Sequence, residues 1–283
     1  MIRFEHVTKL YKTVIGVNDV SLDLASGAYG LLGPNGSGKT TFINLILGQL
    51  RPTIGSVRVF DQDPWQRGEL LRRIGICPAV DILLPNVSAL EWVQYLVRMY
   101  GFTAADAGRR AVAALETVGM QHAMRRPIGS YSLGMRQRCK VAQAIAHEPE
   151  LLILDEPFNG LDPVGRHELT ELFLRWIGER KSILLASHLL YEVEAVRASF
   201  LLISGGRLLA SGSPQEVRSY ARGLAQRDPC SRRSTQGACC AFMRSRIGRF
   251  GPHRHAAERS CRLDPPATCA GPASAGDLER RPL

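Results

Sequence analysis

Gly33-Pro34-Asn35-Gly36-Ser37-Gly38-Lys39-Thr40-Thr41 is the stretch that decides the fold of this chain. Residues 28–32 before it are typical of a short buried strand, and residues 41–48 after it have a helical pattern that ends at a glycine. At a strand-to-helix turn, backbone N–H groups and the positive end of the helix dipole can hold an anion. The spacing GxxxxGK[ST] adds the charge of Lys39 and a hydroxyl of Thr40 for Mg²⁺. The stretch therefore predicts a loop that binds polyphosphate.

A second chemical group follows a continuous apolar run at residues 151–154, which is typical of a strand covered on both faces. The run ends at Asp155 and Glu156. In a chain with a phosphate-binding loop, Asp155 is placed to hold Mg²⁺ opposite Thr40. Glu156 is then positioned to polarise the water that attacks the γ-phosphate. These two carboxylates predict hydrolysis of a bound nucleotide.

A third group begins at Ser132, which can cap a helix expected over residues 133–146. The serine hydroxyl and the free amides at that helix end make another anion site. One chain would then contain two separate phosphate sites.

The order of strands and helices predicts an α/β fold with a mainly parallel sheet, because strand and helix alternate around the phosphate-binding loop. Residues 2–32 read as an antiparallel β part with alternating strands at residues 2–7 and 20–24, and residues of about 78–130 read as a helical subdomain. Gly205-Gly206 predicts a hairpin between two closing strands. Further strands are expected at residues 56–60, 73–77 and 182–186, and helices at residues 88–100, 104–118 and 163–180.

Together the phosphate-binding loop, Tyr131-Ser132-Leu133-Gly134-Met135-Arg136-Gln137-Arg138, and LLILDEPFNGLDP with the later His188 resemble the nucleotide-binding subunit of ABC transporters. The likeness covers about residues 2–220. It implies a P-loop NTPase fold of ABC type, ATP and Mg²⁺ as ligands, and ATP hydrolysis coupled to transport. It also implies two partners, a second ATPase subunit (a homodimer) and an integral membrane permease, with no nucleic acid. The expected location is the cytoplasm, on the inner face of the cell membrane.

The resemblance assigns roles to single residues. Tyr11 matches the aromatic residue that stacks on adenine, and His188 matches the switch histidine that senses the γ-phosphate. Asp162 matches the loop that couples the two sites of the dimer. Glu156 and His188 are the expected catalytic residues. The signature segment, which contacts ATP bound by the other subunit, comprises Ser132, Leu133, Gly134 and Met135.

Two departures from the family pattern stand out. Ala79 occupies the place of a glutamine that normally touches the metal and the attacking water, so slower hydrolysis or altered coupling is expected, and Asp81 is a candidate substitute. The signature has Leu133 and Met135 where glycine and glutamine are commonest, a form that resembles a subgroup of exporters. The helical block at about residues 78–127, including Trp92 and Tyr95, is expected to dock on the permease.

The main alternative is a soluble, non-transport ABC-type ATPase of DNA repair or translation. Repair ATPases separate the two halves of the ATPase by a very long coiled coil, whereas no sustained heptad lies between Lys39 and Asp155. Translation-associated members normally carry two cassettes, and this chain has one of each motif.

Charge and composition divide the 283 residues into an ATPase domain at residues 1–222 and a tail at residues 223–283. The tail has 11 Arg and 5 acidic residues, so it carries most of the net charge of +10. Only 7 of its residues are Leu, Ile, Val or Phe, a composition that predicts disorder. Cys77 and Cys139 are expected to be buried structural thiols. No apolar run has the length of a membrane span or a signal peptide, which favours a cytoplasmic protein.

Overall fold

The computed structural model describes residues 1–212. Those residues include every candidate site residue named above. The predicted disorder of residues 223–283 lies outside the described residues, and so does the predicted domain end at residue 222.

A six-stranded sheet forms the centre of the described part, in the order β5-β6-β7-β3-β8-β9. All neighbouring strands are parallel except β8 and β9, which pair antiparallel through the hairpin predicted at Gly205-Gly206. Both glycines have positive φ, as a tight hairpin turn requires. The strands are β3 (Ala28–Leu32), β5 (Ile74–Cys77), β6 (Leu151–Asp155), β7 (Ser182–Ser187), β8 (Ser199–Ser204) and β9 (Arg207–Gly212).

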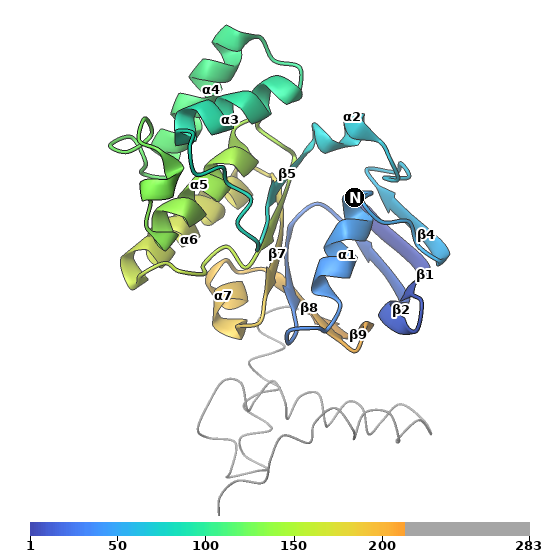
Figure 1. Ribbon diagram of the computed structural model, residues 1–283. Helices are drawn as coiled ribbons and strands as arrows, with labels where there is room; N and C mark the ends of the chain where they lie inside the picture. Colours follow the sequence, from blue (N-terminus) through green and yellow to red (C-terminus); the bar gives the residue numbers. More distant parts are fainter. Residues whose placement is uncertain (213–283) are drawn as a thin grey trace, which may run out of the picture. The chain divides into compact units, whose positions relative to one another are not determined.

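A separate antiparallel sheet has the order β2-β1-β4 and is built from β1 (Ile2–Tyr11), β2 (Val14–Leu24) and β4 (Ile54–Val59). Helix α1 (Lys39–Ile46) lies between this sheet and the six-stranded sheet (Figure 1). Phe42 of α1 stacks on Phe4 of β1 with ring centroids 4.5 Å apart. The small sheet therefore packs on the helix that follows the phosphate-binding loop.

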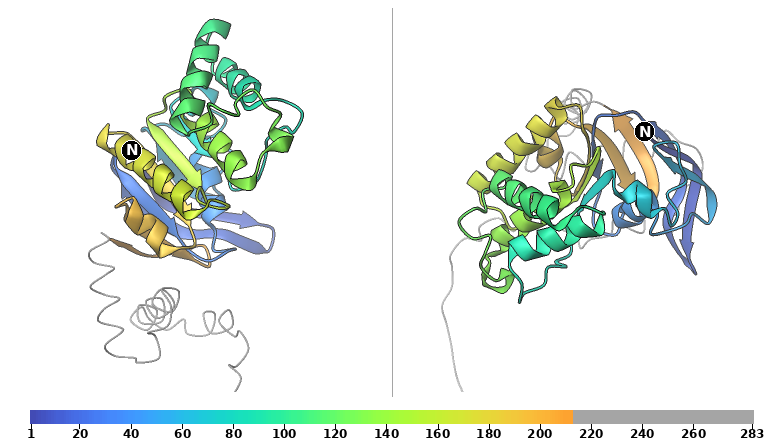
Figure 2. Two further views of the ribbon diagram at one scale, coloured as in Figure 1. Left: turned by 90° about the vertical axis from the view of Figure 1, so that its left-hand side faces the viewer. Right: turned by 90° about the horizontal axis from the view of Figure 1, so that it is seen from above.

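The other face of the six-stranded sheet is covered by α5 (Leu133–Ile145), α6 (Pro163–Gly178) and α7 (Leu190–Ala195). The view from above separates these helices from α1 and the antiparallel sheet (Figure 2, right). Side chains of β6 alternate between the two cores, since Leu152 and Leu154 join the α5 side and Leu151 and Ile153 join the α1 side. This two-sided burial confirms the interpretation of the continuous apolar run.

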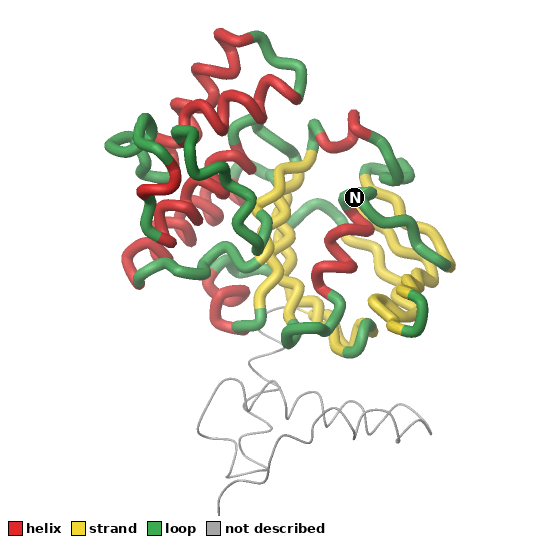
Figure 3. Tube along the Cα trace, viewed as in Figure 1, coloured by secondary structure: helices red, strands yellow, loops and turns green. Residues whose placement is uncertain are grey.

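Between β5 and β6 the chain contains helices and loops but no strand (Figure 3). Helix α3 (Ala89–Met99) begins with a capping box, in which Ser88 and Glu91 satisfy each other's backbone N–H groups. Helix α4 (Ala104–Thr117) is capped by Thr103, and a 3-10 turn at Ile128–Ser130 precedes α5. These elements confirm the predicted helical subdomain.

Several element limits differ from the sequence-based expectation. Helix α1 begins at Lys39, two residues before the expected start, and β1 and β2 extend into a hairpin with its tip near Lys12. The short helix α2 (Gly68–Leu71) was not predicted. Cys77 and Cys139 are free and buried as predicted, and burial raises the pKa of each thiol to about 12. Within residues 1–212, no helix has the length and apolar character needed to cross a membrane.

Candidate ATP-binding and hydrolysis site

The phosphate-binding loop joins β3 to α1 and leaves the first turn of that helix open. Gly38 is the N-cap residue at φ 108°, and it has no side chain to accept hydrogen bonds from the helix amides. A Cβ at Gly38 would lie 2.4 Å from the Gly16 carbonyl oxygen, so only glycine fits. The Ser37 hydroxyl is buried and has no hydrogen-bond partner in the described part of the chain. These unpaired donors suit an anion held against the helix N-terminus.

Lys39 lies inside the loop and not in solvent. Its Nζ donates to the carbonyl oxygens of Gly33 at 2.8 Å and Pro34 at 3.2 Å. Burial lowers the pKa of Lys39, while the charges of Glu156 and Asp155 oppose that shift. Lys39 therefore lies close enough to both predicted carboxylates for their charges to act on it.

Asp155 and Glu156 lie where β6 ends beside β7. Asp155 pairs in register with Ala186, and Glu156 donates its backbone N–H to the Ala186 carbonyl oxygen at 2.9 Å. Burial raises the pKa of Asp155, and the Glu156 charge adds to the rise, whereas Lys39 and Lys140 lower it. Glu156 has φ 52°, a left-handed backbone that a non-glycine residue adopts at a cost of roughly 1–3 kcal/mol.

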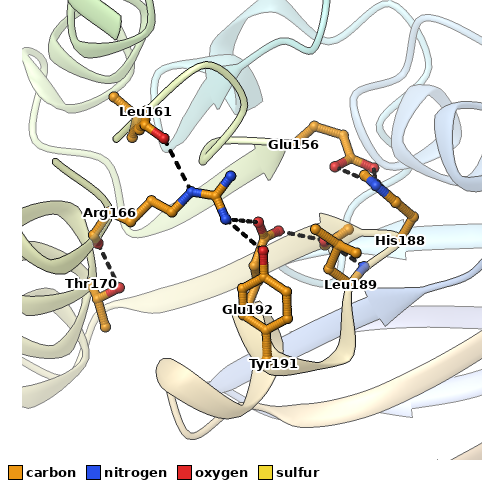
Figure 4. Close-up of polar contacts among 9 residues, drawn as sticks. Glu156, Leu161, Arg166, Thr170, His188, Leu189, Tyr191 and Glu192 are labelled. Carbon is orange, nitrogen blue, oxygen red and sulfur yellow. Dashed lines mark hydrogen bonds and ion pairs between the residues drawn. The ribbon is translucent and has the colours of Figure 1, made fainter. Parts of the chain in front are cut away.

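His188 contacts Glu156 directly (Figure 4). Its Nδ1 is 2.9 Å from each carboxylate oxygen, and the Glu156 side chain is only 11% exposed. Because β7 ends at Ser187, the histidine follows the strand that lies next to β6. The contact fixes the orientation of the Glu156 carboxylate.

Tyr11 lies at the end of β1 beside the start of α1. Its hydroxyl is 3.4 Å from Thr41 Oγ1, and its ring lies over Gly16, where an added Cβ would meet it at 2.7 Å. The side chain is 40% exposed. This half-open aromatic ring next to the loop can stack on a nucleotide base.

The signature segment lies apart from the phosphate-binding loop. Helix α5 packs on the face of the sheet opposite α1, and Ser132 caps it by accepting from the Met135 amide at 3.2 Å. Within residues 1–212, no hydrogen bond joins residues 132–135 to residues 33–41. The start of α1 and the start of α5 therefore do not form one site within a single chain.

The signature segment instead contacts the loop that carries Asp162. A Cβ at Gly160 would lie 2.3 Å from Leu133 Cγ, and a Cβ at Gly134 would lie 3.3 Å from the Gly160 carbonyl oxygen. Asp162 caps α6 by accepting from the Gly165 amide at 2.9 Å. The unusual Leu133 therefore has a packing role against Gly160.

A network that sequence reasoning missed joins this loop to the segment around His188 (Figure 4). Arg166 Nε donates to the Leu161 carbonyl oxygen at 3.2 Å, and its NH1 donates to the Tyr191 hydroxyl at 2.5 Å and lies 3.9 Å from Glu192 Oε1. Glu192 is 3% exposed and accepts from the Ser187 hydroxyl at 2.5 Å. The only sequence signal was a pair of acidic residues in a short helix, which usually face solvent.

Within residues 1–212, Asp81 forms no hydrogen bond or ion pair with Asp155 or Glu156. Its carboxylate pairs with Arg136 of α5 at 2.9 Å and accepts from the Leu83 amide at 3.2 Å. Ala79 is exposed and has only its methyl group to offer. Neither residue supplies the interactions of a glutamine side chain.

The described residues fit ATP with Mg²⁺ on chemical grounds. The uncapped amides of α1, the orphan Ser37 hydroxyl and the Lys39 ammonium are donors for phosphate oxygens. Thr40 is exposed beside them, and Asp155 supplies a carboxylate oxygen, the ligand type that Mg²⁺ prefers. Among residues 1–212, no cluster of three or more His, Cys, Asp or Glu suggests a metal site of the all-protein kind.

Comparison with known proteins identifies relatives that bind ATP. Residues 17–159 match the family model described as ABC transporter. The chain is 36% identical over 219 residues to Nod factor export ATP-binding protein I of Cupriavidus pinatubonensis, an alignment that covers 77% of this chain and 67% of that protein. It is 38% identical over 212 residues to bacitracin transport ATP-binding protein BcrA of Bacillus licheniformis, covering 74% and 68%.

A solved structure of an ATP-binding subunit of an ABC transporter superposes with a TM-score of 0.70 at 27% identity, covering 77% of this chain and 92% of that one. The fold, the phosphate-binding loop and the sequence relatives agree. This chain belongs to the ABC transporter family, and it is an ATP-binding, ATP-hydrolysing subunit of that family.

Proposed function

We propose that two copies of this chain pair head to tail and bind two ATP molecules between them, and that hydrolysis drives export through a separate membrane permease. The observation that carries the proposal is the meeting of Lys39, Asp155, Glu156 and His188 at one sheet edge. The relative named for Nod factor export supports export as the direction of transport.

The separation of the two helix ends supports the dimer. The uncapped start of α1 and the Ser132 end of α5 lie on opposite faces of the sheet, so one ATP molecule needs a second chain to contact both. In this arrangement Ser132 and Gly134, with Leu133 and Met135 around them, meet the γ-phosphate held by the other chain's loop. Asp162 lies next to that contact and connects the two sites through α6.

Within each site the residues have distinct roles. Lys39 and the loop amides hold the β- and γ-phosphates, and Tyr11 stacks on the adenine. Thr40 and Asp155 would hold Mg²⁺, which neutralises charge on the phosphates. Glu156 accepts a proton from the attacking water, and His188 keeps its carboxylate pointed at that water.

The permease contact is proposed for the helical part and the loop before it. Val80, Ile82 and Leu84 are 68%, 49% and 52% exposed in the loop after β5. Tyr95 and Met99 of α3, four residues apart and hence on one helix face, are 58% and 68% exposed. Trp92 is partly buried against the core, and its Nε1 donates to Gln143 Oε1 at 2.7 Å. An exposed apolar surface of this kind is suited to contact with the permease loops at the cytoplasmic face of the membrane, where ATP is supplied.

Glu156→Gln and Lys39→Ala test the assigned roles. Glu156→Gln should bind ATP normally but hydrolyse it at least about 100-fold more slowly, because the general base is lost. Lys39→Ala should lose ATP binding itself, because a charge on the phosphates is removed. Equilibrium binding of a fluorescent ATP analogue and phosphate release measure the two effects. Glu171→Gln, an exposed carboxylate of α6, is the matched control. Undiminished turnover of Glu156→Gln would show that another group activates the water.

A further inference from the structure

Helix α5 carries a buried lysine that holds the chain just after β5. Lys140 is only 5% exposed, although lysine is rarely buried. Its Nζ donates to the carbonyl oxygens of Pro78 at 3.0 Å and Ala79 at 3.2 Å. Helix α5 therefore holds the backbone at Ala79, the position where the family pattern leads us to expect a glutamine.

Two further side chains of α5 contact the same stretch. Arg136 Nε lies 2.9 Å from Asp81 Oδ2, and Gln137 Nε2 lies 3.5 Å from Cys77 Sγ. Residues 136 and 140 are four apart, so both point from one side of the helix. We call residues 78–81, which Lys140 and Arg136 contact together, the clasped segment.

The lysine contact is costly to break. A buried ammonium without acceptors is strongly unfavourable. Within residues 1–212, the Lys140 ammonium donates hydrogen bonds only to these two carbonyl oxygens. The Lys140 charge also lies close enough to Asp155 to favour the ionised carboxylate. Since α5 starts at Ser132, a movement of that helix end and a movement of the clasped segment are mechanically joined.

We propose that Lys140 is a positioning residue, which links the clasped segment to the Ser132 end of α5 in place of the side chain that Ala79 lacks. This inference rests on the proposed function, since it takes Ser132 as a contact of ATP in the dimer. The exposed Val80 lies within the clasped segment, and Ile82 and Leu84 follow it. ATP bound at Ser132 therefore acts through α5 on the surface that is proposed to contact the permease.

The link is measurable without the permease. In a full-length Glu156→Gln chain, Val80→Cys supplies a reporter thiol, and serine replaces the five cysteines after residue 229. Cys77 and Cys139 stay, because both are buried with the pKa raised to about 12 and do not form thiolate. The rate of maleimide labelling is compared with and without ATP. We expect ATP to change it about fivefold, the lower end of ordinary coupling between sites.

Lys140→Met keeps the length of the side chain and removes the ammonium. It should abolish the ATP effect on labelling while ATP still binds and still induces dimers. In the chain with Glu156, it should lower kcat about fivefold and leave KM for ATP within about twofold, because Lys140 does not touch the nucleotide. Lys181→Met is the matched control, since that lysine pairs with Glu179 far along the chain at the end of α6.

Asp81→Asn is the second variant, and it guards against misfolding of Lys140→Met. Asp81 is half exposed, so its loss should leave the fold intact, and it should reduce the ATP effect by breaking the Arg136 pair. An ATP effect that persists at full size in both variants overturns the proposal, and so does its absence from the parent chain when that chain dimerises with ATP. A parent chain that binds ATP but never dimerises contradicts the proposed function instead.

Discussion

Ala79 stands at the position where we expect a glutamine from the family pattern. Its side chain is exposed, and the backbone contact with Lys140 does not depend on it. We therefore expect Ala79→Gln to fold normally and to leave ATP turnover unchanged or raise it by up to about tenfold, the effect of one added interaction worth about 1.4 kcal/mol in the transition state. Steady-state phosphate release measures this. A marked loss would mean that a side chain there obstructs the site.

His147 gives the fold a specific sensitivity to acid. Its ring stacks on Tyr100 with centroids 4.1 Å apart, and its Nε2 donates to the Ile74 carbonyl oxygen at 3.1 Å. Burial, with a smaller effect of Arg110, lowers the pKa of His147 from 6.5 to about 4. Below pH 6.5 this histidine binds a proton in the unfolded chain, whereas in the folded chain it does not bind one until about pH 4. The free energy of unfolding therefore falls as the pH falls through this window.

His147→Phe tests this sensitivity, because phenylalanine can keep the stacking and cannot titrate. Between pH 7 and pH 4.5 the free energy of unfolding of the natural chain should fall by about 2 kcal/mol more than that of the variant. Urea titrations at the two pH values measure the difference. The same loss in both proteins would assign the acid sensitivity to other groups.

At the level of elements, the contact between α5 and the loop before α6 depends on Gly160. This residue has φ 75°, and an added Cβ would overlap the Leu133 side chain. Gly160→Ala should destabilise the fold by about 1–2 kcal/mol from the left-handed backbone alone, with more from the overlap.

Leu133→Ala should remove the overlap but not the backbone strain. In a double-mutant cycle followed by urea unfolding, the two changes should therefore be less destabilising together than the sum of the single changes. Strict additivity would show that Leu133 does not rest on Gly160.

The sequence predicted the elements with a clear period well and others poorly. Strands buried on both faces and helices with capping residues, such as β6 and α3, were found close to their true limits. The tip of the β1–β2 hairpin was missed, because bulges at Val7 and Lys9 break the alternation and Val14 and Ile15 are exposed. Helix α2 has four residues, too few for a period.

At the scale of the whole molecule, contacts between residues far apart in the sequence could not be predicted. The motifs named the candidate catalytic residues, because each motif follows a strand or starts a helix. The structure places His188 in contact with Glu156, and their catalytic roles stay predictions. Nothing local predicts that β3 lies between β7 and β8, nor that Arg166 meets a buried Glu192. Lys140 is buried although lysine is usually exposed, so its burial could not be predicted from the sequence.

The central claim is that each ATP site is shared between two chains, and the most direct test is the mass of the ATP-bound protein. Glu156→Gln should sediment as a monomer with ADP and as a dimer of twice that mass with ATP. Adding Ser132→Arg should abolish the dimer and leave ATP binding intact, because Ser132 lies on the opposite face of the sheet from α1. Loss of ATP binding by the Ser132→Arg monomer, or a Glu156→Gln chain that stays monomeric at saturating ATP, would contradict the account.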